Sequence, residues 1–197
     1  MLLLNAPADD LEDTFRHSIF LWIDVEAPDQ KPSFVLVYDA VLADFGPAVI
    51  TTFLKRFAAP CQPLYGYAFK RPFRLGPEFY VFGTLQGITS LSDDPDIARA
   101  AEEVTLWKNH YVMPDGTYTL GDLRDVYPYN WLCATHLARK ITVAGHTQTL
   151  KAFIKASPDH GSLLSAGADR WIWHLDEAQR LKVRNLLKPT GPLLCVL

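Results

Sequence analysis

Residues 161–191, GSLLSAGADRWIWHLDEAQRLKVRNLLKPTG, indicate the fold class because a hairpin pattern is followed directly by a helix pattern. The hairpin pattern consists of two apolar runs joined by Gly167, Ala168 and Asp169, which are residue types found at tight bends. A hairpin that leads into an amphipathic helix predicts a layer of strands covered by a helix.

The helix pattern starts at Asp176, whose carboxylate can accept hydrogen bonds from the first backbone N–H groups of a helix. It runs to Lys188, and Pro189 and Gly191 then stop it. Four apolar residues are expected to face inward, namely Leu181, Val183, Leu186 and Leu187. The segment therefore predicts a helix that packs on the hairpin.

The flanking segments continue this mixture of strands and helices. KITVAG, residues 140–145, predicts a strand, and TLKAFIKA, residues 149–156, predicts a helix. PLLCVL, residues 192–197, predicts a final apolar strand. We therefore expect an α+β fold, a single domain with a mostly antiparallel sheet and helices packed on one face. A length of 197 residues fits one domain, with subdomains 1–118 and 119–197 as the alternative division.

The N-terminal part of the sequence predicts further strands and helices. Residues 16–26 alternate apolar positions with polar or aromatic ones, which is typical of a strand. Residues 34–45 and 47–58 predict helices, the second with Pro47 in its first turn. The other elements expected are two aromatic strands and one helix, at 64–70, 78–86 and 92–110.

Composition excludes several classes of function. A net charge of −3 and a pI near 6.0 give no long-range attraction for nucleic acid. No segment approaches the roughly 18 consecutive apolar residues of a membrane helix. The start, MLLLNAPADD, lacks the basic and long apolar regions of a secretory signal. Three cysteines without short metal-type spacing indicate reduced thiols, so we expect a cytoplasmic protein.

The short signatures of common enzymes are missing from the sequence. It contains no P-loop, no G-x-G-x-x-G, no H-E-x-x-H, no G-x-S-x-G and no paired C-x-x-C. Cys133 and His136 are a candidate nucleophile and base, but cysteine is more often a buried residue. The sequence therefore predicts no catalytic residue, no metal and no cofactor.

One stretch, LRDVYPYNWLCATHLARK at residues 123–140, concentrates the chemically interesting side chains. Pro128 disfavours helix before it, and Asn130 is the residue type that caps a helix, so we expect a loop followed by a helix from Asn130. One interpretation is a packed corner of the core. The other is an exposed aromatic cluster of the kind enriched at protein interfaces. The candidate partner-binding residues are Arg124, Asp125, Tyr127, Tyr129, Trp131 and His136.

The order LRDVYPYNWL…HL, TLKAFI, GSL, WIWHLD and VRNLL…G resembles the C-terminal portion of bacterial toxin-immunity proteins, including those of type VI secretion. The resemblance covers roughly residues 120–194. Its carriers are Leu123, Arg124, Asp125, Tyr127, Pro128, Asn130, Leu132, Gly161, Leu163, Trp171, Trp173, Val183 and Arg184. The resemblance implies a bacterial cytoplasmic protein that neutralises a secreted toxin by occluding it, without catalysis of its own.

The sequence thus favours a non-catalytic protein-binding module, with a protein partner and no membrane partner. The alternative is a small-molecule-binding protein or a hydrolytic enzyme with a pocket around Arg124, Asp125, Tyr127 and His136, to which Asp24 could contribute. A purely structural subunit would present a large apolar dimer patch instead. The sequence favours no particular oligomeric state.

Overall fold

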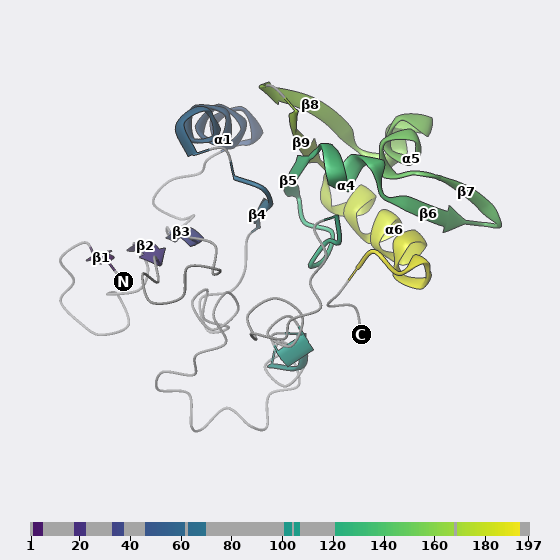
Figure 1. Cartoon of the computed structure of the whole chain (residues 1–197), viewed down its shortest axis with the longest axis horizontal. Helices are drawn as coiled ribbons and strands as arrows, with labels where there is room; N and C mark the ends of the chain where they lie inside the picture. The colour runs from purple at the N-terminus through teal and green to yellow at the C-terminus, as the bar shows by residue number, and fades with distance from the viewer. Residues whose placement is uncertain are drawn as a thin grey trace. The chain divides into compact units, whose positions relative to one another are not determined.

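The computed structural model describes residues 2–5, 18–22, 33–37, 46–61, 63–69, 101–103, 105–106, 121–167 and 169–193 (Figure 1). The chain divides into two compact units, Met1–Pro47 and Ala48–Leu197. Helices and antiparallel sheets make up its secondary structure, so the fold class is α+β as expected.

The first unit contains a three-stranded antiparallel sheet in the order β1-β2-β3. Its strands are Leu2–Asn5, Ser18–Trp22 and Ser33–Val37. The strand expected at 16–26 is confirmed over β2, whereas the helix expected at 34–45 is wrong over residues 34–37. Residues of β3 pair with β2 along its whole length, and this pairing outweighs the weak helical periodicity of a short apolar run.

The second unit contains a four-stranded antiparallel sheet in the order β4-β5-β9-β8 and a two-stranded hairpin, β6-β7. The strands are β4 Gly66–Ala68, β5 Tyr129–Cys133, β6 Lys140–Val143, β7 His146–Thr149, β8 Ser162–Gly167 and β9 Arg170–His174. The helices are α1 Pro47–Cys61, α4 Ala134–Ala138, α5 Leu150–Ala156 and α6 Glu177–Leu187, with short 3-10 helices η4 Pro158–His160 and η5 Lys188–Thr190. Residues 101–103 and 105–106 are also helical.

The hairpin and the helix expected within residues 161–191 are both confirmed. Strands β8 and β9 pair around a bend at which Gly167 and Asp169 have positive φ angles of 127° and 54°. Asp176 caps α6, because its carboxylate accepts a hydrogen bond from the Gln179 backbone N–H at 2.8 Å and the Gln179 side chain accepts one from Asp176 N–H at 2.9 Å. The local sequence therefore determines where this helix begins.

The inward face of α6 is narrower than expected. Val183 and Leu187 are fully buried, and Leu186 is half-buried. Leu181 is 49% exposed, so its expected inward position is wrong. Residues two apart in an α-helix lie roughly 200° apart around the axis, so Leu181 cannot share a narrow face with Val183.

The helix expected from Asn130 is also wrong at its start. Residues 129–133 form the strand β5, and α4 begins only at Ala134, with Cys133 as its N-cap. Asn130 does not cap a helix, because its side-chain oxygen accepts from Tyr127 N–H at 3.1 Å and its amide donates to the Tyr127 carbonyl at 2.6 Å. These local bonds stabilise the turn that leads into β5.

The four-stranded sheet has two differently covered faces. On one face Leu132 and Trp173 pack in the main core with residues of α5 and α6, such as Phe153 and Val183. On the other face Trp131 and Ile172 contact residues of α1. The expected covering of one face by helices holds for α5 and α6, and α1 adds a helix to the opposite face.

Other predicted elements are confirmed or lie outside the described residues. The predictions for 47–58, 64–70, 140–145 and 149–156 correspond to α1, β4, β6 and α5. The strand β7, which the sequence did not predict, pairs with β6 across a two-residue turn. The strand expected at 78–86, most of the helix at 92–110, and residues 194–197 lie outside the described part of the chain, as does Asp24.

Candidate functional site

All six candidate residues lie in the interior. Their relative solvent exposure lies between 0% and 7% for the whole set of Arg124, Asp125, Tyr127, Tyr129, Trp131 and His136. They come from the loop before β5, from β5 itself and from α4. The exposed aromatic cluster considered from the sequence is therefore corrected to a packed corner of the core. A direct role of these residues in partner binding stays a prediction.

Arg124 connects the loop before β5 to strand β4 and to Tyr65, the residue that precedes β4. Its Nη1 donates to the Tyr67 hydroxyl at 2.7 Å, and its backbone N–H donates to the Tyr65 hydroxyl at 2.9 Å. The Tyr67 ring in turn stacks on Tyr127, with 4.3 Å between ring centroids. A fully buried guanidinium needs such polar partners because burial removes its hydration. Arg124 and Tyr127 therefore act together as a structural link between the loop and β4.

Asp125 ties the same loop to α6. Arg184 Nε donates to the two carboxylate oxygens of Asp125 at 2.9 and 3.0 Å, and Val126 N–H donates to one of them at 2.7 Å. Arg184 also lies 3.8 Å from the buried carboxylate of Glu103. The two acids and the arginine form a partly buried charge network, which is the arrangement that compensates the desolvation of charged groups.

Tyr129 and Trp131 lie on the face of β5 that α1 covers. The Trp131 indole N–H donates to the Pro63 carbonyl at 2.8 Å, so its polar edge is satisfied inside the protein. Ile50 and Leu54 of α1 pack against the buried cluster that Tyr129 and Trp131 form with Ile172. Both aromatic side chains are thus part of the buried cluster against which α1 packs.

Cys133 and His136 are in contact, as their spacing suggested. Cys133 Sγ lies 3.1 Å from His136 Nδ1, and Cys133 backbone N–H also points at Nδ1 with an N to N distance of 3.3 Å. Because the backbone N–H can only donate, Nδ1 is an acceptor and the proton of the neutral ring lies on Nε2. The ring stacks on Tyr65 at 5.1 Å between centroids.

The electrostatics of His136 oppose a role as a base. Burial, followed by the positive charge of Arg170, lowers the pKa of His136 to about 4. A thiolate paired with a protonated imidazole needs the charged ring that this environment disfavours. Among the described residues, His136 Nε2 also has no hydrogen-bond partner. The pair therefore resembles a buried structural contact more than an activated nucleophile.

The described residues contain no cluster of three or more histidine, cysteine, aspartate or glutamate side chains that could hold a metal ion. In the same part of the chain, no helix is both long enough and apolar enough to cross a bilayer.

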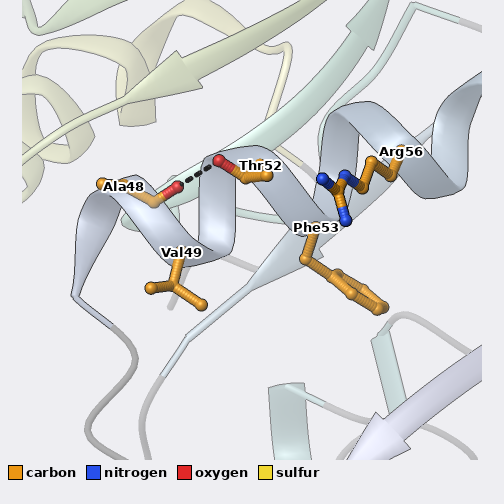
Figure 2. A pocket seen from close by; sticks show the side chains of 5 residues that line it. All are labelled: Ala48, Val49, Thr52, Phe53 and Arg56. Atoms are coloured by element: carbon orange, nitrogen blue, oxygen red, sulfur yellow. Dashed lines mark hydrogen bonds between the residues drawn. The ribbon is translucent and has the colours of Figure 1, made fainter.

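Sequence reasoning missed a surface on α1. Val49 and Phe53 are 49% and 42% exposed, and they line a surface hollow of about 590 Å³ with Ala48, Thr52 and Arg56 (Figure 2). We call these five residues the α1 outer face. Figure 2 shows Val49 and Phe53 projecting from the same side of the helix. The available signal was that α1 carries large apolar residues at 49 and 53 in addition to those at 50 and 54.

Comparisons with known proteins place the chain in no family. No family model, no curated protein and no solved structure matches it. The resemblance to toxin-immunity proteins stays a prediction.

Proposed function

We propose that this protein is a non-catalytic protein-binding module and that the α1 outer face is its binding surface. The observation that carries the proposal is the exposure of Val49 and Phe53 side by side on one helix. Single exposed apolar residues are ordinary, but neighbouring large ones around a hollow are typical of protein contact sites. A helix already fixed to a sheet offers such residues without a large ordering cost on binding.

The buried stretch 123–140 supports this proposal as the scaffold of the surface. Ile50 and Leu54 pack against the cluster that contains Tyr129 and Trp131, so their side of α1 faces the sheet. Val49 and Phe53 lie away from this packed side and are 49% and 42% exposed. In this account the aromatic residues of the stretch act on binding through the position of α1.

The contacts of the polar candidates support a protein without catalysis. Arg124 and Asp125 are engaged with Tyr67 and Arg184, and His136 is buried and neutral. Catalytic acids and bases need a pKa near the working pH and access to a substrate. His136 meets neither condition, because it is buried and its pKa is about 4.

The immunity role belongs to the same proposal. On the resemblance of residues 120–194, the partner is a secreted bacterial toxin, and the protein occludes it in the cytoplasm of the cell that must be protected. An exposed apolar helix face suits occlusion, because a non-catalytic inhibitor works by covering the site it blocks.

The proposal is tested by a pull-down from lysate of the source organism, with partner recovery quantified against bait. The wild type is compared with Phe53→Ser and with Leu181→Ser. The second is a matched control, because Leu181 is also an exposed helical residue but lies on α6. We expect a stoichiometric partner that Phe53→Ser loses and Leu181→Ser keeps. Equal capture by both folded variants would place the binding surface elsewhere.

A further inference from the structure

We infer that the outer edge of strand β8 pairs with the β8 edge of a second copy of this chain, antiparallel and across a two-fold axis. The inference goes beyond the proposed function, because it concerns a different surface and a different partner. Three features of β8 carry it: main-chain groups that point out of the sheet, a sequence without edge protection, and apolar side chains on both faces of the sheet.

Strand β8 lies at the end of its sheet. In the order β4-β5-β9-β8 it pairs with β9 on one side, and none of the described strands pairs with its other side (Figure 1). An end strand presents a row of main-chain N–H and C=O groups that can bond another strand. Ser162, Ser165 and Gly167 are exposed, so β8 is accessible from outside along its length.

The pairing of β9 shows which of its residues bond to β8. The Leu175 N–H donates to the carbonyl of Pro128, the residue before β5, at 2.9 Å, so the main chain at position 175 faces β5. The main-chain groups of successive residues in a strand point to opposite sides. His174 and Ile172 therefore direct their N–H and C=O groups toward β8.

The register then identifies the outward groups of β8. Ser162 and Leu164 are the residues opposite His174 and Ile172, so their main-chain groups bond to β9. The main-chain groups of Leu163 and Ser165 point the other way, out of the sheet. A two-fold axis at Leu164 places Leu163 of each copy opposite Ser165 of the other. Each of these pairs exchanges both of its N–H to C=O bonds.

The sequence of β8, SLLSAG, contains no charged residue and no proline. Proteins prevent pairing between edges with lysines, prolines, inward-pointing charges or very short edge strands. The strand β4, at the other end of the described sheet, has only three residues, whereas β8 has six. The irregularity in β8 lies at its end, between Ser165 and Gly167. An uncharged antiparallel edge is its own hydrogen-bonding complement, so a second copy fits it without opposing charges.

The side chains of β8 also match a second copy. Leu163 is half-buried against the main core, and Leu164 is half-buried against the cluster on the α1 side of the sheet. With the axis at Leu164, the two Leu164 side chains lie directly opposite each other in a non-hydrogen-bonded pair, in which side chains come closest. Pairing thus buries the remaining apolar surface of both leucines, which stabilises the dimer.

The first test is sedimentation velocity of the full-length protein over a concentration series. We expect a reversible dimer of the wild type. Ser165→Pro removes an outward N–H but no bond to β9, and Ser165→Lys adds a charge to the edge, so each should weaken the dimer at least about tenfold. The matched control is His146→Lys, which adds a lysine at an exposed position of β7 and should dimerise as the wild type does. Circular dichroism verifies that each variant is folded. A wild type that is monomeric at every concentration, or a dimer that both folded Ser165 variants retain, overturns the inference.

Cysteine crosslinking tests the register. Leu164→Cys places two thiols opposite each other at the axis, whereas the thiols of Leu163→Cys lie on a longer diagonal. Under mild oxidation we expect a disulfide-linked dimer from Leu164→Cys, and from Leu163→Cys no more than the wild type gives through its own cysteines. Equal yields from the two variants overturn the pairing. A monomeric wild type that captures a lysate protein through β8, with capture lost in Ser165→Pro, makes a partner's strand the occupant and also overturns it. None of these outcomes changes capture at the α1 outer face, so failure of this inference is distinct from failure of the proposed function.

Discussion

His136 couples the core around β5 to pH. Its imidazole is fully buried and accepts from Cys133 N–H, and burial lowers its pKa from 6.5 to about 4. Between these pH values the unfolded chain is protonated at this residue and the folded chain is not. Lowering the pH through this window therefore favours unfolding, and the loss levels off below pH 4.

We predict that the free energy of unfolding falls by roughly 3 kcal/mol between pH 7 and pH 4 because of His136, since each pH unit in the window is worth about 1.4 kcal/mol. Urea unfolding at several pH values measures it. The control is His136→Asn, whose side-chain oxygen can accept in place of Nδ1 but does not titrate. His174, whose pKa burial also lowers, contributes equally to both proteins. Parallel pH profiles of the wild type and the variant would disprove the role of His136.

Asp125 is the residue that anchors the loop before β5 to α6. Asp125→Asn keeps an oxygen for Val126 N–H but removes the charge that faces Arg184. We expect a loss of about 2 kcal/mol, as for a hydrogen bond to a charged group. Chemical denaturation measures it, with Lys182→Met as the matched control. Because Lys182 and Asp159 form an exposed ion pair, the control should unfold at the same urea concentration as the wild type.

At the scale of elements, Gly161 controls the entry into β8. Its φ of 85° and ψ of −168° lie in a region that is essentially restricted to glycine. A Cβ atom at this position would also lie 2.4 Å from the His174 carbonyl oxygen. We therefore predict that Gly161→Ala lowers the unfolding free energy by at least about 2 kcal/mol. The matched change is Gly46→Ala, where a Cβ meets nothing within 4 Å and φ carries no such penalty. Equal stability of the two variants would contradict this account.

In the turn of the β6-β7 hairpin, by contrast, a substitution is expected to raise stability. Ala144 and Gly145 form its turn with positive φ angles of 50° and 81°, and alanine tolerates this region poorly. Ala144→Asn should raise the stability by roughly 0.5–1 kcal/mol, because asparagine adopts the left-handed conformation more readily. Thermal unfolding measures the change. A lower melting temperature would show that the turn does not limit the hairpin.

The elements that could be predicted are those whose signals are local. Asp176 and Gln179 cap α6 through bonds within four residues, and Gly167 and Asp169 adopt positive φ angles at the bend between β8 and β9. The strand β5 could not be recognised, because Tyr129–Cys133 is extended by pairing with β4 and β9, which lie far away in the sequence. Leu181 is a different case, because helical periodicity alone places it roughly 200° around the axis from the buried Val183.

At the scale of the whole molecule, the sequence located the chemically dense stretch but not its environment. Arg124, Asp125 and His136 are polar residues, and only the packing of β4, α6 and the loop shows that they are buried. The α1 outer face escaped notice for the converse reason. Val49 and Ile50 are equally apolar in the sequence, and contacts with Trp131 and Ile172 decide which side of the helix turns inward.

We predict that substitutions at buried and at exposed positions around α1 differ in their effect on the free energy of unfolding. Trp131→Ala removes a fully buried ring beneath α1 and should cost about 3–5 kcal/mol, so it should disturb folding itself. Val49→Ser changes a side chain that is 49% exposed and should alter stability by about 1 kcal/mol or less. Denaturation curves of the two variants check this difference. A Trp131→Ala protein as stable as the wild type would show that the Trp131 ring is not buried beneath α1.

Site-specific photocrosslinking can show whether a protein partner contacts the chain at the α1 outer face. A photoreactive amino acid is placed at Val49 in one protein and at Leu181 in another, two positions with the same 49% exposure. After illumination in lysate, we expect one defined crosslinked partner from position 49 and none from position 181. No crosslink from position 49, or the same products from both positions, would contradict it.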